Sequence, residues 1–255
     1  MLSKAIEDLV LKFEGITLEE MDRVKLMNRV DTKFAFSTEH FLKFLPDLVE
    51  HFKILEIEGT RTPRYESLYF DDENFKMYLD HHNGRKNRFK IRYRKYVESN
   101  LSFLEIKHKF KNRTNKRRIK VESIPDKDIP EDQLAFINKI LPQPLALKPT
   151  LWNGFNRLTL VNKTENERLT LDFNLIFHWE DRKVELDNLI IAELKQESAD
   201  RNSAFYALMK KHSIRPYRLS KYCIGSMQLY DKSVIKSNRF KKKLLKINKI
   251  QTNAA

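Results

Sequence analysis

The stretch FLEIKHKF, residues 103–110, carries charges at every second position of a segment that otherwise has the apolar content of a buried strand. In an extended chain successive side chains point to opposite faces. Glu105, Lys107 and Lys109 therefore share one face, opposite a largely apolar one. The apolar face must be covered by other elements, and the charged face must stay hydrated or paired, because dry, unpaired charges are costly. This requirement restricts the folds that are open to the chain.

The same alternation recurs in several other segments. The charged positions that share a face are Arg29/Asp31/Lys33, Lys90/Arg92/Arg94, Arg168/Thr170/Asp172 and Glu193/Lys195. Amphipathic helical segments lie between the strands, and one of them opens with a capping box of Thr17 and Glu20. We therefore expect an α+β fold, namely a closed antiparallel β-barrel tunnel of about eight strands, with a charged, hydrated interior and helices packed outside.

The length of 255 residues and a hydrophobic content of 41% are enough for one large domain. No boundary is evident before residue 230. We expect a single tunnel domain over residues 1–230, with N-terminal helices within 1–27, and a basic C-terminal tail over 231–255. Residues 232–249 hold eight Lys/Arg and no acid, so the tail is expected to be a solvated helix end or a disordered arm.

Cysteine content and hydropathy indicate in which cellular compartment the protein is expected. One cysteine, Cys223, cannot form an internal disulfide and suits a reducing compartment. The first apolar stretch contains acids, which is typical of an amphipathic helix and not of a signal peptide. No apolar run approaches the roughly 18–20 residues that cross a bilayer. A cytoplasmic location is expected.

The net charge of +14 points to a polyanionic partner. Residues 85–120 hold fifteen Lys/Arg against two Glu. Arginine suits forked contacts with phosphate oxygens, and lysine acts as a point charge. Glu105 and Glu193 each lie one strand step from a cation. Each carboxylate either balances the cations or holds a divalent metal, Mg²⁺ or Mn²⁺, that bridges phosphate oxygens.

The order of the segments resembles the VTC domain, the catalytic module of the vacuolar transporter chaperone polyphosphate polymerases, within the triphosphate tunnel metalloenzyme (CYTH-like) superfamily. The segments are NRVDTKF, YESLYFDD, RFKIRYRKY, FLEIKHKF, NKRR, FNR, RLTLDFNL, AELKQE and RLSKYCIG. The resemblance implies a metal-dependent polymerase that extends inorganic polyphosphate with the γ-phosphate of ATP and releases ADP. It also implies a membrane-protein partner at the inner face of the membrane, and no nucleic acid is expected.

Residue roles follow from the same resemblance. The predicted catalytic residues are Lys33, Arg92, Arg94, Lys107, Arg157 and Lys221. The predicted substrate-binding residues are Arg29, Lys90, Lys109, Lys116, Arg118, Arg168 and Lys195. Glu193 is similar to the metal-binding glutamate of the family, and Glu105 either joins it or only balances charge.

Two other functions stay open. Tunnel triphosphatases carry a Glu-x-Glu-x-Lys strand, whereas this chain has Arg29-Val-Asp31-Thr-Lys33, in which a cation replaces one acid. Fewer acids favour transfer between phosphates over hydrolysis, with a tunnel triphosphatase as the alternative. The second alternative, from a different class, is a non-enzymatic polyanion-binding module.

Overall fold

The computed structural model describes residues 2–23, 30–111 and 113–252. The helices are α1 (Leu2–Val10), α2 (Leu18–Arg23), α3 (Thr38–Phe44), α4 (Lys76–His82), α5 (Glu131–Asn138), α6 (Ala204–Lys211), α7 (Lys221–Leu229) and α8 (Lys241–Thr252), with 3₁₀ turns η1 (Pro46–Leu48) and η2 (Asn238–Phe240). The strands are β1 (Gly15–Ile16), β2 (Val30–Ser37), β3 (Phe52–Leu55), β4 (Arg64–Asp71), β5 (Asn87–Tyr96), β6 (Leu101–Phe110), β7 (Arg113–Val121), β8 (Lys148–Asn162), β9 (Glu167–Trp179), β10 (Arg182–Leu186) and β11 (Leu189–Gln196).

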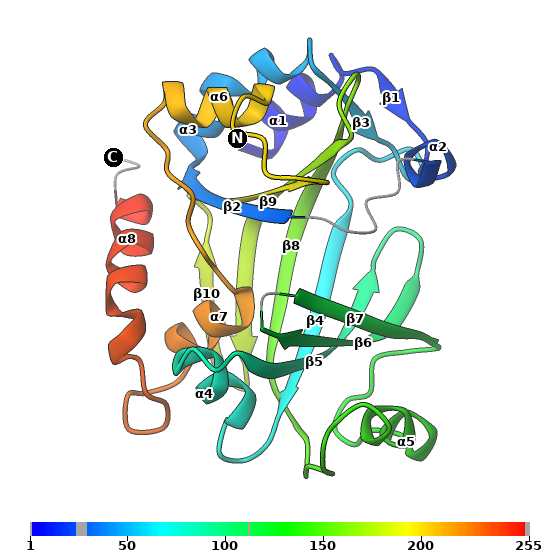
Figure 1. The fold of residues 1–255 in the computed structure, drawn as a ribbon, viewed down its shortest axis with the longest axis vertical. Coiled ribbons are helices and arrows are strands. Elements are labelled where there is room, and N and C mark those ends of the chain that lie inside the picture. Colours follow the sequence, from blue (N-terminus) through cyan, green and yellow to red (C-terminus); the bar gives the residue numbers. More distant parts are fainter. Residues whose placement is uncertain (1, 24–29, 112, 253–255) are drawn as a thin grey trace.

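Eight strands form one antiparallel path in the order β2-β11-β9-β8-β4-β5-β6-β7. The path curls, so β2 and β5–β7 stand nearer the viewer than the fainter β8 and β9 in Figure 1. The predicted α+β fold with an antiparallel eight-stranded sheet is confirmed.

Closure of the barrel is the part of the prediction that needs correction. Among the described residues the end strands β2 and β7 do not pair, so the sheet is an open half-barrel. The sequence of β7 fits an unpaired edge, because it carries five Lys/Arg in nine residues and most of them are exposed.

The outer, apolar face of the sheet is covered by helices, as the alternation predicts. Helices α1, α3 and α6 pack on β2, β9 and β11 through residues such as Phe41, Phe205 and Phe34. Helix α5 and the segments beside it pack on β5 and β6 through Ile137 and Leu104. The charged face of each strand is thereby left on the concave side of the half-barrel.

Part of the concave side is filled by α7. Tyr222, Cys223 and Ile224 of this helix lie in a buried cluster with Tyr69 and Phe177. The helix lies very close to β9, since a Cβ added at Gly225 would be 2.4 Å from the Phe177 ring. The contact leaves room for glycine alone and fixes the start of α7 beside the charged face.

The capping box of α2 forms as expected, with the backbone amide of Thr17 donating to Glu20 and that of Glu20 donating to the Thr17 hydroxyl. The C-terminal segment was expected to be a solvated helix end or a disordered arm, and the structure shows a helix that also packs on the domain. Residues Lys241–Thr252 form α8, and its Ile247 is fully buried against the cluster that holds α7. In the described part of the chain no helix is long and apolar enough to span a membrane.

Candidate functional site

The concave face of β5, β6 and β7 is a ladder of cations. Lys90, Lys107 and Lys116 lie directly opposite one another across the three strands. The next rung consists of Arg92, Glu105 and Arg118, which are likewise in register. Like charges that face each other across strands are destabilising, so this surface favours an anion above it. We call this face, with the concave faces of β2, β8, β9 and β11, the basic trough.

Glu105 is the carboxylate of this ladder, and its side chain is fully buried. Its Oε2 accepts from Arg92 Nη2 at 2.6 Å and Nε at 2.9 Å, and its Oε1 forms an ion pair with Lys116. Burial alone would raise the pKa of Glu105, but Arg92, Arg94 and Lys116 hold it far below its usual range. Both oxygens are engaged by cations and the carboxylate is closed to solvent, so Glu105 balances charge; Glu193, described below, is also paired with cations but stays 22% exposed.

Arg94 and Lys107 have no such partner. Arg94 is buried, its Nε donates to Ser67 at 3.3 Å, and its guanidinium lies over the rings of Tyr65 and Phe155. Burial and repulsion from Arg92 lower its pKa. Repulsion from Arg92, followed by burial, lowers the pKa of Lys107 well below its ordinary value. Within residues 30–111 and 113–252 neither group forms an ion pair with a carboxylate.

The opposite wall, on β2 and β11, centres on Glu193. Lys33 Nζ lies 2.5 Å from its Oε1, and Lys195 Nζ lies 3.4 Å from its Oε2. Burial would raise the pKa of Glu193, but Lys195, Lys33 and Lys107 hold it well below the ordinary value. Because Lys107 belongs to β6, the curl of the sheet has brought the two walls within electrostatic reach.

Asp31 stands beside Glu193 on this wall. Burial, the charge of Glu193 and a hydrogen bond between the two carboxyl groups raise the pKa of Asp31. Two negative charges side by side are costly here, and a divalent cation with a preference for oxygen ligands would offset both of them. No group of three His, Cys, Asp or Glu that could hold a metal is found among the described residues. Asp31 and Glu193 fit a metal whose other ligands are phosphate oxygens and water.

A third charged group joins β8, β9 and the start of α7. Asp172 accepts from Arg157 Nε at 2.6 Å and Nη2 at 2.8 Å, and it forms a short ion pair with Lys221. Burial opposes ionisation of Asp172, yet Arg157 and Lys221 hold its pKa far below the usual range. Burial lowers the pKa of Lys221 to about 8 despite this partner.

Sequence reasoning placed Asp172 on a charged face but gave it no role. The detectable signal was its alternation with Arg168 and Thr170. What the sequence could not give was the identity of its partners, because Arg157 and Lys221 lie 15 and 49 residues away along the chain.

The other predicted residues lie at different depths. Lys90 donates to Ser220 at 2.6 Å, and burial lowers its pKa to about 8, as it does for Lys195. Arg118 is exposed and lies over the Phe103 ring at 4.6 Å. Arg168 lies near α2, with Nη1 3.7 Å from the sulfur of Met21. Lys109 is half-buried opposite Arg88. Arg29 falls outside the described residues.

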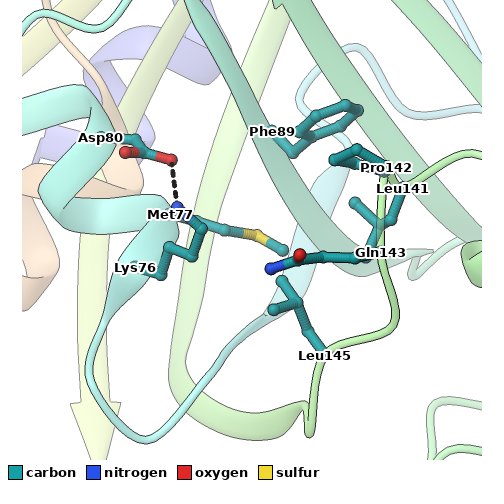
Figure 2. Close-up of a pocket in the computed structure, with 8 residues that line it drawn as sticks. All are labelled: Lys76, Met77, Asp80, Phe89, Leu141, Pro142, Gln143 and Leu145. Atoms are coloured by element: carbon teal, nitrogen blue, oxygen red, sulfur yellow. Dashed lines mark hydrogen bonds and ion pairs between the residues drawn. The ribbon is translucent and has the colours of Figure 1, made fainter.

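A separate, mainly apolar cavity of about 40 Å³ lies between α4 and the segment before β8. Figure 2 shows its lining, in which Met77 reaches toward Gln143 and Leu145, Phe89 lies beside Pro142, and Lys76 and Asp80 pair at the rim. It belongs to the outer side of the sheet, where Met77 of α4 and Phe89 of β5 lie in one apolar cluster, and none of the predicted site residues lines it.

Two solved structures are similar to this chain. A protein from Hippeastrum, described as an adenylyl cyclase with a dominant triphosphatase activity, is similar with a TM-score of 0.51 and 11% identity, over 80% of this chain and 98% of that one. A protein from Vibrio parahaemolyticus described as an adenylate cyclase gives a TM-score of 0.45 and 10% identity, over 77% of this chain and 97% of that one.

A comparison with curated protein sequences finds no match. The family model described as VTC domain matches residues 28–230, and this span contains all of the charged groups of the basic trough. The chain therefore belongs to the VTC-domain family.

Proposed function

We propose that this chain is a metal-dependent polyphosphate polymerase, which transfers the γ-phosphoryl group of ATP to an inorganic polyphosphate chain and releases ADP. The observation that carries the proposal is the pair Arg94 and Lys107, which are lowered in pKa on one wall of the trough without a carboxylate partner among the described residues. Such cations are costly to maintain unless a strongly anionic ligand neutralises them.

The excess of positive charge along the trough points to the same ligand class. Among the described residues of the three charged groups and their neighbours, nine cations face four carboxylates: Lys33, Lys90, Arg92, Arg94, Lys107, Lys116, Arg157, Lys195 and Lys221 against Asp31, Glu105, Asp172 and Glu193. A triphosphate carries about the missing charge, and Arg and Lys suit its oxygens.

In this proposal catalysis comes from positioning and charge stabilisation. A terminal phosphate oxygen of the polyphosphate chain attacks the γ-phosphorus, the bond from that phosphorus to the β–γ bridging oxygen breaks, and ADP leaves with the bond's electrons. Arg94 and Lys107 hold the transferring group, and Lys221 and Arg157 offset charge beside it. A divalent ion on Glu193 and Asp31 would supply further charge neutralisation when bound. The acceptor oxygen is already anionic, so no strong base is required.

The ion-paired carboxylates of the trough also favour phosphate over water as the acceptor of the phosphoryl group. Glu105 and Asp172 are each engaged by two cations and have a strongly lowered pKa, so neither is a good proton acceptor. One observation favours the alternative, a tunnel triphosphatase: the raised pKa of Asp31 beside Glu193 gives a carboxyl group able to take a proton from water. The Hippeastrum protein of similar fold is described with triphosphatase activity.

Product analysis separates these functions. The chain is incubated with ATP labelled at the γ-phosphate and with Mn²⁺ or Mg²⁺, and the products are resolved by electrophoresis. Labelled long chains together with ADP support the polymerase. Labelled orthophosphate alone indicates the triphosphatase, and binding without turnover indicates the polyanion-binding module. Glu193→Gln and Lys221→Ala are expected to abolish turnover, whereas Lys210→Ala, at an exposed site on α6, serves as the matched control.

A further inference from the structure

The charged row of β5 continues beyond the basic trough. Its alternate positions are, in order outward, Arg94, Arg92, Lys90 and Arg88. Arg94 and Arg88 are six residues apart along the strand, a distance of about 20 Å, which is longer than a triphosphate. Arg88 lies directly opposite Lys109 of β6. Together with Arg218 and Lys243 these two residues form a group that we call the outer cation cluster.

Cross-strand register pairs Arg88 with Lys109, the hydrogen bond from Lys90 to Ser220 holds the segment of Arg218 beside β5, and that from Tyr217 to Lys242 joins the start of α8 to the same segment. The Lys243 ammonium lies 4.6 Å over the Phe240 ring, which contacts the His81 ring at 5.8 Å. Burial and then repulsion from Arg218 and Arg88 lower the pKa of Lys243. Lys109 is affected in the same way, first by burial and then by Arg88 and Arg218. The cluster is thus mutually repulsive.

Compensating negative charge is scarce around the cluster. Asp80 acts on Arg88, but its carboxylate already forms an ion pair with Lys76 at 3.4 Å. Among the described residues no carboxylate forms an ion pair with any of the four cations. All four side chains are at least partly exposed, so the cluster is open to a ligand.

Helix α8 adds a second, independent observation. Its first turn, Lys241, Lys242 and Lys243, contains three cations and no acid. Positive charge at a helix N-terminus opposes the helix dipole, whereas an anion there is favourable. The helix begins beside the segment that precedes α7, because the Tyr217 hydroxyl donates to the carbonyl of Lys242. An anion at the outer cation cluster would therefore stabilise α8 as well.

Lys90 connects the cluster to the trough. Its ammonium donates to Ser220 at 2.6 Å, two residues after Arg218, and it stands in register with Lys107. A phosphate chain that lies on Lys107 and Lys90 would thus reach Arg88 next. No gap in the row of cations separates the two regions.

We propose that the outer cation cluster binds the part of an inorganic polyphosphate chain that extends beyond the reacting phosphates. The inference rests on the proposed function for the identity of the ligand. It adds a second binding segment, to which α8 contributes although that helix lies after the residues matched by the family, 28–230. The cluster is expected to select for chain length, since a triphosphate in the trough does not reach it.

Binding of short and long chains tests the proposal. The variant Arg88→Ala/Arg218→Ala/Lys243→Ala is compared with the wild type by titration calorimetry, using sodium tripolyphosphate and a long-chain sodium polyphosphate. The long-chain Kd is expected to rise about tenfold or more, and the slope of log K against log salt is expected to fall by about 2, since three phosphate contacts are lost. The tripolyphosphate Kd is expected to stay within about twofold. A control, Lys127→Ala/Lys148→Ala/Lys210→Ala, removes three exposed cations elsewhere and should leave both unchanged within the same margin.

Several results would overturn the proposal. An equal loss for both ligands would mean that the cluster acts only through the general field of the protein, and no loss for either would mean that it binds no phosphate chain. Vesicles containing phosphatidylserine form a third arm: loss of vesicle binding with unchanged long-chain affinity would assign the cluster to a membrane surface. If the wild type binds long chains but turns over no ATP, the proposed function fails and the length selectivity still supports the outer site.

Discussion

Replacing Lys107 by Met keeps an unbranched side chain that is one atom shorter and removes the charge. We expect this variant to be more stable than the wild type and to bind phosphate chains more weakly. Lys107 faces Lys90 and Lys116 across the strands, and repulsion from Arg92 with burial already lowers its pKa well below the ordinary value. In this position the charge therefore opposes folding and favours the ligand.

The size of both effects follows from these contacts. Two like-charged cross-strand pairs cost about 0.2–1 kcal/mol each, so their removal contributes about 0.4–2 kcal/mol. For a domain of this size that raises the melting temperature by about 1–8 °C. Loss of the attraction to Glu193 reduces the gain, but Glu193 retains Lys33 and Lys195. One charge-assisted contact to phosphate contributes about 1.5–3 kcal/mol, so the Kd for tripolyphosphate should rise roughly 10–150-fold.

Lys116→Met is the matched control, because it makes the same substitution one strand away on the same rung. Lys116 pairs with Oε1 of the fully buried Glu105. Its removal leaves that oxygen without its cation, which should cost about 1–2 kcal/mol, the lower part of the usual range because Lys116 is itself 35% exposed. Thermal unfolding and titration calorimetry measure both quantities. If Lys107→Met lowers the melting temperature as much as Lys116→Met, the argument from unpaired charge is wrong.

Asp172→Asn leaves Arg157 and Lys221 buried without their carboxylate, so the free energy of unfolding in urea should fall by about 3–5 kcal/mol; a loss below 1 kcal/mol would contradict the pairing. Lys195 has a pKa of about 8 because of burial, so affinity for tripolyphosphate should fall as pH rises from 8 to 9. Over pH 8–10 the unliganded protein should become more stable, since the unfolded chain then binds more protons, and calorimetry that showed parallel trends in affinity and stability would refute this. Ile247→Ala should cost about 2–5 kcal/mol in the same urea assay because α8 is packed on the domain; an effect under 0.5 kcal/mol would mean that it is detached.

The alternation of residue types carried most of the predictable information. Because cross-strand neighbours share a face, the charged rows around Lys107 and Glu193 were expected to lie on one side of the sheet, and they do. The resemblance placed Arg94 and Lys221 in the site, and the structure locates both beside the Phe155 ring. Alternation is a local property, and it is preserved wherever the sheet has one apolar face.

The ion pairs between side chains of distant segments could not be predicted from the sequence. The carboxylate partner of each cation depends on strand order and curl, so the engagement of Glu105 by Arg92 and Lys116, and of Asp172 by Lys221, was not predicted. Closure of the barrel was predicted wrongly, because alternation shows that a sheet has two different faces and does not show whether its edges meet. The packing of α8 on the domain was not predicted. Residues 232–249 hold eight cations, which indicate a solvent-exposed segment, and within α8 Ile247 is the residue that is buried.

The failure of β2 and β7 to pair with each other has a consequence for the polyphosphate chain of the proposed function. A channel with a complete wall admits a chain only by its end, so a long polymer must thread through it from a terminus. In the described part of this chain β2 and β7 do not pair, and the segment before α7 reaches across from the β2 edge to β5, where Tyr217 N donates to the Lys33 carbonyl and Lys90 donates to Ser220. Under the proposed function, a polyphosphate chain would be able to enter sideways along the part of the open side that this segment leaves free. Capture of a long chain would then be governed by how many interior units it offers, and not by how rarely one of its two ends arrives.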